Sequence, residues 1–200
     1  MTRPVERLRD GDLHDRLSPL RRFISDFTEL VDGVSDKEAL LDHGGRLLGE
    51  LLAAEGWLPE SHARPDPDRY RQYLLYADPA GRFSVVSFVW GPGQATPVHD
   101  HTVWGLVGVL SGAEISERFA IADGELRSLG KERLGTGAID RLDPAAGDIH
   151  RVSNAYDDAV SISIHVYGAD IGTVERSIYD MKGQARPFVS AYAPAPDLPF

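Results

Sequence analysis

Three histidines in two short segments have the residue type and the spacing that suit a metal site. His99 and His101 lie in TPVHDHTVWG, and His150 lies in PAAGDIHRVSN. If the first segment is a β-strand, side chains alternate between its faces, so His99 and His101 project together and Asp100 points the other way. Two imidazoles at this spacing can bind one metal ion, although a bare pair of this kind is more often two surface histidines.

Glycines near these histidines favour the metal interpretation. Gly93 precedes His99 by six positions, and Gly147 precedes His150 by three, with Asn154 four positions beyond. This paired arrangement, spread over residues 83–167, resembles the double motif of the cupin superfamily, whose glycines suit tight barrel corners. The resemblance implies that His150 reaches the same metal ion from another strand.

A second group of polar residues lies in SISIHVYG, residues 161–168. Ser163, His165 and Tyr167 alternate with apolar residues, so a strand would place all three on one face. A hydroxyl, an imidazole and a phenol in line can form a hydrogen-bond relay. Taken alone, the alternation fits the polar outer face of an amphipathic strand better.

The elements that must position these residues change in character along the chain. Apolar residues recur at spacings of three and four over residues 17–33, which predicts an amphipathic helix. Ser35 opens the capping-box pattern Ser-Asp-Lys-Glu, which predicts a second helix that Gly44 and Gly45 weaken or divide. From about residue 70, short runs rich in β-branched and aromatic residues are separated by turn residues, which is typical of a β-sandwich or barrel.

We therefore expect one mainly-β domain spanning residues 1–200. Its parts are expected to be a helical segment, a proline-containing linker, a β-barrel and an extended tail, at residues 1–58, 59–69, 70–180 and 181–200. His14, His43 and His62 fall in helical or linker sequence and are interpreted as surface or capping histidines.

Composition excludes several classes of function. The net charge of −10 argues against nucleic acid and against anionic membrane surfaces as partners. The chain has no cysteine, which excludes disulfides, thiolate metal sites and a cysteine nucleophile. No apolar run has the length of roughly 18 residues that a membrane span needs. The N-terminal residues lack a secretory signal, so a cytoplasmic location is expected. Nothing in the sequence points to a particular oligomeric state.

Three motifs together resemble one family. WGxGxxxPxHDH, the third histidine in GDIH, and SxHxY look like the cysteine dioxygenase family of thiol dioxygenases, over about residues 70–180. The resemblance implies a cupin barrel (double-stranded β-helix, or jelly roll) with N-terminal α-helices. It also implies Fe(II) held by His99, His101 and His150. The expected partners are a small carboxylated thiol and O₂, and the expected product is a sulfinic acid. The relay Ser163–His165–Tyr167 would then place the tyrosine hydroxyl near substrate and oxygen.

Gly105 marks a departure from both patterns. Many cupins have a glutamate ligand at this place, and animal cysteine dioxygenases have a cysteine there that is cross-linked to the tyrosine. With glycine, the ligands would be three neutral imidazoles, a set that suits non-haem iron and favours an anionic substrate ligand such as a thiolate. Zinc stays open, because a three-histidine site with water also suits hydrolysis.

Two further positions bear on the substrate. Gln72 stands where cysteine dioxygenases have the arginine that binds the substrate carboxylate. This resembles the bacterial branch that prefers 3-mercaptopropionate, in which an arginine after the tyrosine makes that contact, here Arg176. Arg71 would restore the cysteine-type arginine after a one-residue shift, and strand alternation allows only one of residues 71 and 72 to line the pocket. The plainer reading of Arg176 is a surface salt bridge with Glu175 or Asp180.

We expect 3-mercaptopropionate to be converted to 3-sulfinopropionate, with L-cysteine as the alternative substrate. A non-catalytic cupin that binds a metal or a small ligand is a rival from a different class, as is a zinc or manganese cupin enzyme. The polar line through His165 argues against a pure binder, because binding alone needs no relay.

Overall fold

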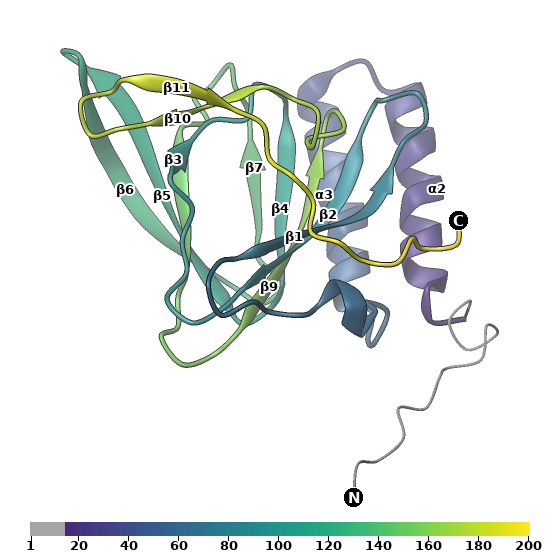
Figure 1. Cartoon of the computed structure of the whole chain (residues 1–200). Coiled ribbons are helices and arrows are strands. Elements are labelled where there is room, and N and C mark those ends of the chain that lie inside the picture. The colour runs from purple at the N-terminus through teal and green to yellow at the C-terminus, as the bar shows by residue number, and fades with distance from the viewer. Residues whose placement is uncertain (1–14) are drawn as a thin grey trace, which may run out of the picture.

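The computed structural model describes residues 15–200, so the first fourteen residues, including His14, lie outside the described part of the chain. Two helices come first, α2 (Ser18–Gly33) and α3 (Lys37–Ala53), and a short 3₁₀ turn (Glu60–His62) leads into the strands (Figure 1). The apolar stripe of α2 is buried, as its spacing predicts: Leu20, Phe23, Ile24, Phe27. No described helix has both the length and the apolar character needed to cross a membrane.

The start and the middle of α3 differ from expectation. Asp36, not Ser35, caps the helix, since its carboxylate accepts a hydrogen bond of 2.9 Å from the backbone N–H of Ala39. The helix also continues undivided through its glycine pair. A Cβ on Gly44 would lie 2.8 Å from Cε2 of Phe27. The missing side chain therefore allows α2 to approach α3 closely, and this packing offsets the low helix propensity of glycine.

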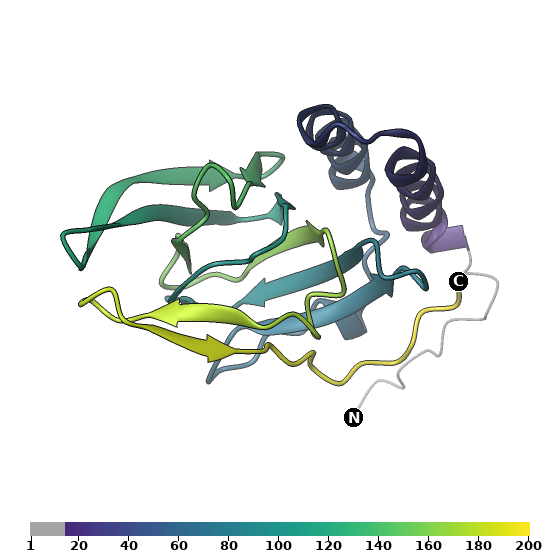
Figure 2. The same ribbon diagram turned by 90° about the horizontal axis from the view of Figure 1, so that it is seen from above.

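Eleven strands follow in the described part of the chain: β1 (Arg71–Ala77), β2 (Ser84–Trp90), β3 (Val98–His99), β4 (Gly105–Ser111), β5 (Ala113–Ala122), β6 (Glu125–Gly135), β7 (Ile139–Leu142), β8 (His150–Asn154), β9 (Ser161–Tyr167), β10 (Arg176–Tyr179) and β11 (Ala185–Phe188). They form two antiparallel sheets, ordered β1-β2-β9-β4-β7 and β11-β10-β3-β8-β5-β6. The two sheets face each other as a barrel (Figure 2). The predicted fold class, a mainly-β cupin barrel with N-terminal helices, is confirmed.

The five-stranded sheet has apolar packing on both faces. Its outer face contacts the helices, where Leu48 of α3 and Phe27 of α2 pack with Val85 and Leu106. Figures 1 and 2 show both helices on this side of the barrel. The inner face contributes a second core that contains Val86, Phe88, Trp90, Val107 and Tyr167. Strand β9 lies between β2 and β4 in this sheet, so its inward side chains are held on both sides.

The segment expected as a linker contains a buried residue. His62, interpreted from sequence as a surface or capping residue, is 1% exposed. Its ring packs edge-on against Tyr73, with 6.0 Å between the ring centroids, and its backbone carbonyl accepts a 2.9 Å hydrogen bond from Ser87. The three prolines of the segment predicted a linker, and no sequence pattern indicated that it packs against β1 and β2. His43, in contrast, is exposed as expected.

The C-terminal residues are more structured than an extended tail. Residues 185–188 form β11, which pairs with β10, so the second sheet continues past residue 180. The remaining residues run back across the barrel toward α2 (Figure 1). On the way Ala193 N–H donates a 2.7 Å hydrogen bond to the carbonyl of Gln72, and Phe200 packs against Tyr76. The four residues ARPF were missed as a strand because they contain a proline and show no alternation.

Candidate metal centre

The three histidines come together from two strands and the loop after β3. His99 and His150 are register partners across β3 and β8, and His101 follows two residues after His99. Each pair of rings has 4.8 Å between centroids, and one ring nitrogen from each lies within 4.8 Å of the others. All three side chains are buried. The segments that the motifs singled out therefore meet at one point.

Burial also puts these imidazoles in the form that binds metals. It lowers the pKa of His99 to about 4 and holds the pKa values of His101 and His150 well below their usual range. A neutral imidazole has a free lone pair, which metal binding requires. In the described structure, Nδ1 of His101 and Nδ1 of His150 are buried without a hydrogen-bond partner. Three neutral nitrogen donors fit a divalent transition metal.

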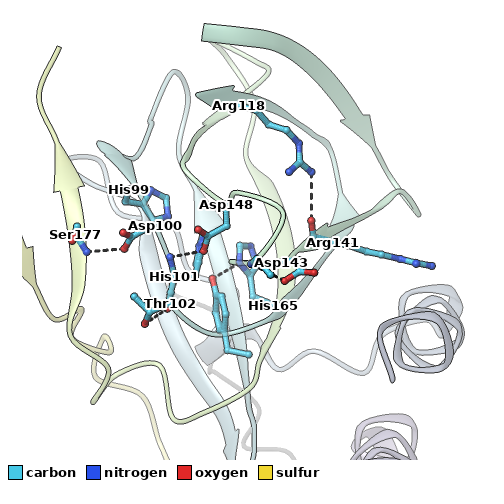
Figure 3. Close-up of polar contacts among 12 residues, drawn as sticks. His99, Asp100, His101, Thr102, Arg118, Arg141, Asp143, Asp148, His165 and Ser177 are labelled. Atoms are coloured by element: carbon cyan, nitrogen blue, oxygen red, sulfur yellow. Dashed lines mark hydrogen bonds and ion pairs between the residues drawn. The ribbon is translucent and has the colours of Figure 1, made fainter. Parts of the chain in front are cut away.

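Neighbouring groups fix how two of the rings are presented. The carboxylate of Asp148 accepts a 2.8 Å hydrogen bond from the backbone N–H of His101, and the same oxygen lies 3.4 Å from Nδ1 of that ring (Figure 3). Nδ1 of His99 lies 3.0 Å from the carbonyl oxygen of Pro97. Such outer contacts restrict ring orientation at metal sites, and Asp148 was not recognised from the sequence.

Asp100 points away from the cluster, as strand alternation predicts. Its carboxylate accepts a 2.8 Å hydrogen bond from the backbone N–H of Ser177 (Figure 3). It also accepts a 2.6 Å hydrogen bond from the hydroxyl of Tyr179. Both partners belong to β10. Asp100 therefore ties the histidine segment to the neighbouring strand and contributes no ligand to the cluster.

The polar line on β9 faces inward and forms a continuous chain of contacts. Ser163 Oγ lies 2.8 Å from Nε2 of His165, and Nδ1 of His165 lies 2.7 Å from the hydroxyl of Tyr167. The indole N–H of Trp90 donates a 3.2 Å hydrogen bond to Ser163. All of these side chains are buried, so the alternative of a polar outer face does not hold. Trp90, which belongs to the inner core, therefore also takes part in this polar chain.

The relay ends beside the histidine cluster. The ring of Tyr167 stacks on that of His101, with 5.6 Å between centroids and 19° between planes. Phe88 stacks on His165 at 3.9 Å. Burial lowers the pKa of His165 to about 3 and raises the pKa of Tyr167. At neutral pH the imidazole is therefore uncharged and the phenol keeps its proton.

Gly105 lies next to the tyrosine. It is the register partner of Tyr167 across β4 and β9, and a Cβ at this position would lie 3.2 Å from Cδ1 of the tyrosine ring. A Cβ would also lie 3.1 Å from Leu142. The close packing leaves little room for a larger side chain, so the described cluster consists of imidazoles alone.

A cavity with about 290 Å³ of empty space, its open mouth included, adjoins the cluster. It is lined by Tyr70, Gln72, Phe88, Thr96, Pro97, His99, Tyr167, Arg176 and Phe188. A wider outer hollow shares four of these residues and adds Arg71 and Ser190. Of the two adjacent β1 residues, only Gln72 lines the inner cavity. Arg71 instead forms an ion pair with Asp66.

Arg176 is a buried cation in this cavity. It is 5% exposed, and its Nη2 donates a 2.6 Å hydrogen bond to Ser190. The guanidinium lies 4.6 Å from the ring centroid of Phe188, and Nε has no hydrogen-bond partner in the described structure. The alternative interpretation of Arg176, a surface salt bridge with Glu175 or Asp180, does not hold in the described structure. Burial lowers its pKa, although an arginine remains charged at neutral pH.

Sequence reasoning missed one buried acid near the relay. Glu114, on β5, is 0% exposed and lies close to Ser163 and Trp90. It belongs to no motif. Its alternation with Ser116 and Arg118 in AEISERF is the only signal that the sequence offered, and that pattern alone is common on solvated strands.

The chain matches one family model and is similar to several solved structures. The chain matches the family described as cysteine dioxygenase type I over residues 52–181, a span that contains the three histidines, the relay, Gln72 and Arg176. It is similar to a double-stranded β-helix protein from Klebsiella pneumoniae, with 17% identity, a TM-score of 0.46, and coverage of 69% of this chain and 93% of that one. It is also similar to a cupin 2 conserved barrel domain protein from Salinispora arenicola, with 21% identity, a TM-score of 0.40, and coverage of 56% and 86%. Because the family match extends over more than half of its residues, the chain belongs to the cysteine dioxygenase type I family.

Proposed function

We propose that this protein is an Fe(II)-dependent thiol dioxygenase that oxidises a small carboxylated thiol, preferably 3-mercaptopropionate, to the sulfinic acid. The observation that carries the proposal is Arg176, a buried cation in the same cavity as His99 and Tyr167. Buried charges in proteins are normally paired, and no described carboxylate forms an ion pair with Arg176. A substrate carboxylate would supply the missing partner.

The metal would be held by His99, His101 and His150. Bound Fe(II) supplies coordination sites for the thiol and O₂ and the redox chemistry that joins them. The protein contributes three neutral imidazoles, which leave the charge of the ion uncompensated. The site therefore favours an anionic ligand, and a thiol that enters as its thiolate meets this condition.

Arg176 would orient the substrate. A charge-assisted hydrogen bond to a carboxylate is stronger than a neutral one, and Ser190 already fixes one edge of the guanidinium. The aromatic rings of Phe88 and Phe188 line the same cavity and can cover the apolar carbons of the substrate. With its carboxylate held at one end, the thiol is directed toward the histidine cluster, which reduces the entropic cost of reaching the reactive geometry.

Tyr167 would act on the reacting groups from the side of the relay. Its hydroxyl remains protonated because burial raises its pKa, and its ring is fixed against His101. His165 lies within hydrogen-bond distance of the hydroxyl and limits its orientation. The role proposed for Tyr167 is to hold a hydrogen bond to substrate or oxygen at the buried wall of the cavity.

The residues lining the cavity favour 3-mercaptopropionate over L-cysteine. None of the nine residues around the inner cavity is acidic, and the single charged one is a cation. The ammonium group of cysteine would find no carboxylate there and would be repelled by Arg176. A thiol that carries a carboxylate and no amine avoids this cost. The position of Gln72 in the inner cavity, with Arg71 paired outside it, supports the same preference.

The test is oxygen uptake by the anaerobically iron-loaded protein, with 3-mercaptopropionate and L-cysteine measured side by side. We expect equal amounts of O₂ and thiol to be consumed and sulfinate to form. The kcat/KM should be greater for 3-mercaptopropionate by about tenfold or more, since about 1.4 kcal/mol of unmatched interaction is worth that factor. The reverse ratio would assign the protein to cysteine oxidation. No uptake with either thiol, despite stoichiometric iron, would rule out a dioxygenase of these thiols.

A further inference from the structure

Glu114 points into the barrel, at the far end of the relay from the metal cluster. It is the register partner of Asn154 across β5 and β8, and Arg118 on the same strand is the partner of His150. Directly paired residues in antiparallel strands share a face, and His150 points inward. Residues 114 and 118 are an even number of positions apart, so Glu114 points inward as well.

The carboxyl group of Glu114 has no fixed partner. Both of its oxygens are buried without a hydrogen bond in the described structure. Its register partner Asn154 is committed elsewhere, because its amide nitrogen donates to the carbonyls of Trp90, Gly91 and Ala159. The polar groups near the carboxyl are Ser163 on β9 and Trp90 on β2. A buried acid normally finds a partner, and of these two neighbours only the Ser163 hydroxyl can both donate and accept a hydrogen bond.

A contact between Glu114 and Ser163 would determine the direction of the hydrogen bonds along the relay. Ser163 has one proton and two lone pairs, and Trp90 already donates to one of those lone pairs. His165 is neutral, so only one of its ring nitrogens carries a proton. If Ser163 donates to Nε2, then Nδ1–H donates to Tyr167, and the tyrosine proton is free to point into the cavity. If Nε2–H donates to Ser163, the Tyr167 hydroxyl must donate to Nδ1.

We propose that Glu114 is a positioning residue that sets the direction of this relay. As a neutral acid, Glu114 donates to Ser163. Ser163 then donates to His165, His165 donates to Tyr167, and the Tyr167 proton is available in the cavity. As a carboxylate it accepts from Ser163, which reverses the relay and turns the Tyr167 proton back to His165. The relay direction depends on no metal or substrate, whereas its consequence for catalysis rests on the proposed dioxygenase activity.

The exchange between the two states is balanced. Each proton moves one hydrogen bond along the chain: from Glu114 to Ser163, from Ser163 to Nε2 of His165, and from Nδ1 to the Tyr167 oxygen. The original tyrosine proton leaves for water or a bound ligand in the cavity. Glu114 is then a carboxylate, and one proton has passed from the buried acid to the reaction side of the barrel.

The surroundings of Glu114 place this exchange near neutral pH. Burial raises the pKa of Glu114 to about 7, with smaller opposing effects of Ser163 and Trp90. The residues that face it from neighbouring strands carry no charge: Ser163, Trp90, Asn154 and Leu134. Of the titratable groups along the relay, His165 has a pKa of about 3, and burial raises the pKa of Tyr167 above its usual value. Neither changes its own charge as Glu114 ionises.

The direct test is the tautomer of His165, read by ¹⁵N NMR on the metal-free full chain between about pH 5 and pH 9, on either side of the Glu114 pKa of about 7. We expect the Nδ1–H tautomer in acid and the Nε2–H tautomer in base. Glu114→Gln cannot ionise, so its His165 signals should not change over this range. A His165 tautomer that does not change in the wild type, or that changes equally in Glu114→Gln, would overturn the proposal.

Glu117→Gln is the matched control. Glu117 lies on the same strand but on the opposite face, where its carboxylate pairs with Arg151 and accepts from Ser128. Its substitution also removes a β5 carboxylate, and the His165 titration should match that of the wild type. A tautomer change lost in both variants would indicate a general disturbance of the strand and would count against Glu114.

Activity of the iron-loaded chain separates this inference from the proposed function. We expect kcat of the wild type to fall as pH rises through about 7 and this fall to be absent in Glu114→Gln. Glu114→Met should lower kcat by about tenfold with little change in KM, less than the ~10²-fold or more that a directly acting proton-transfer group contributes. A tautomer change without any thiol oxidation would support the relay and exclude the dioxygenase. Thiol oxidation with the same pH profile in wild type and Glu114→Gln would support the dioxygenase and reject a role for Glu114 in it.

Discussion

The surroundings of the Arg176 side chain indicate the charge of the ligand that would bind beside it. The guanidinium is held by Ser190 on one edge and by the ring of Phe188 on one face, while Nε is left without a protein partner. A buried cation arranged in this way stabilises an anion of matching size more than it stabilises the empty fold. The same side chain should therefore contribute to substrate binding and to the choice between thiols.

Replacing Arg176 by alanine should raise KM for 3-mercaptopropionate by about 10- to 100-fold, since a hydrogen bond to a charged group contributes about 1.5–3 kcal/mol. Steady-state oxygen uptake measures this change. Arg71→Ala is the matched control, because Arg71 pairs with Asp66 outside the inner cavity. An unchanged KM in Arg176→Ala, or an equal change in Arg71→Ala, would remove Arg176 from the substrate site.

Replacing His150 by alanine should abolish stoichiometric iron binding. The imidazole is one of three in the cluster, and its loss leaves two ligands for an ion that prefers more. Metal analysis after iron loading and desalting measures the effect, with circular dichroism to check the fold. His43→Ala, which removes an exposed histidine from α3, should keep the iron content of the wild type. Full iron retention in His150→Ala would argue against the proposed ligand set.

At the scale of elements, the two helices support the strand that carries the relay. Helices α2 and α3 pack on the outer face of the sheet whose central strand, β9, carries the relay on its inner face. The two glycines of α3 have different surroundings. A Cβ on Gly44 would lie 2.8 Å from Phe27 and 3.0 Å from Leu106, whereas a Cβ on Gly45 would meet nothing within 4 Å.

The glycine pair gives opposite expected effects from the same substitution. Gly44→Ala should lower the free energy of unfolding by about 1–3 kcal/mol, because overpacking forces Phe27 or Leu106 to move. Gly45→Ala should raise it by about 0.5–1 kcal/mol, because alanine has the higher helix propensity and nothing opposes it. Urea unfolding followed by circular dichroism compares the two. Equal effects of the two substitutions would contradict the packing of α2 on α3 described above.

At the scale of the whole molecule, a charged cluster joins the helices to the barrel. Arg82, in the turn between β1 and β2, donates hydrogen bonds to Asp78 at 2.8 and 2.6 Å and also pairs with Asp32 on α2. Asp78 is 5% exposed. The hydrogen bonds from the Arg82 side chain are the main cause that lowers the pKa of Asp78 to about 2.

This pKa predicts how stability depends on pH. The folded-state pKa of Asp78 is below its ordinary value of 3.8, so the folded state binds its proton less readily than the unfolded chain does. The contribution of Asp78 is therefore fully present above about pH 4 and is lost as pH falls toward about 2. Thermal unfolding of Asp78→Asn should show a lower Tm than the wild type at neutral pH, and the difference should shrink across this acid range. A difference that is independent of pH would contradict the pairing.

Local sequence patterns predicted the barrel and the histidine segments. The roles of several buried residues depend on contacts with residues distant in sequence, which such patterns do not predict. The barrel could be predicted because short runs of β-branched and aromatic residues are separated by turn residues, and the histidine segments could be recognised because turn glycines frame them. Asp148 and Glu114 could not, because each matters through a residue that is distant in sequence: His101 for the first and Ser163 for the second. The burial of His62 likewise depends on how the linker folds against Ser87 and Tyr73.

Because Ser190 lies late in the chain, it is synthesised after the three histidines of the cluster. Domains begin to fold while the chain is still being synthesised from its N-terminus. The residues of the histidine cluster are made first, and Phe188 and Ser190, which complete the wall around Arg176, are made later. All three proposed metal ligands are therefore synthesised before the residues that complete the cavity, although His99 also pairs with Ile178 of β10 in the finished barrel. The proposed selection of a small anion would then depend on a segment that the ribosome adds after all of the proposed metal ligands.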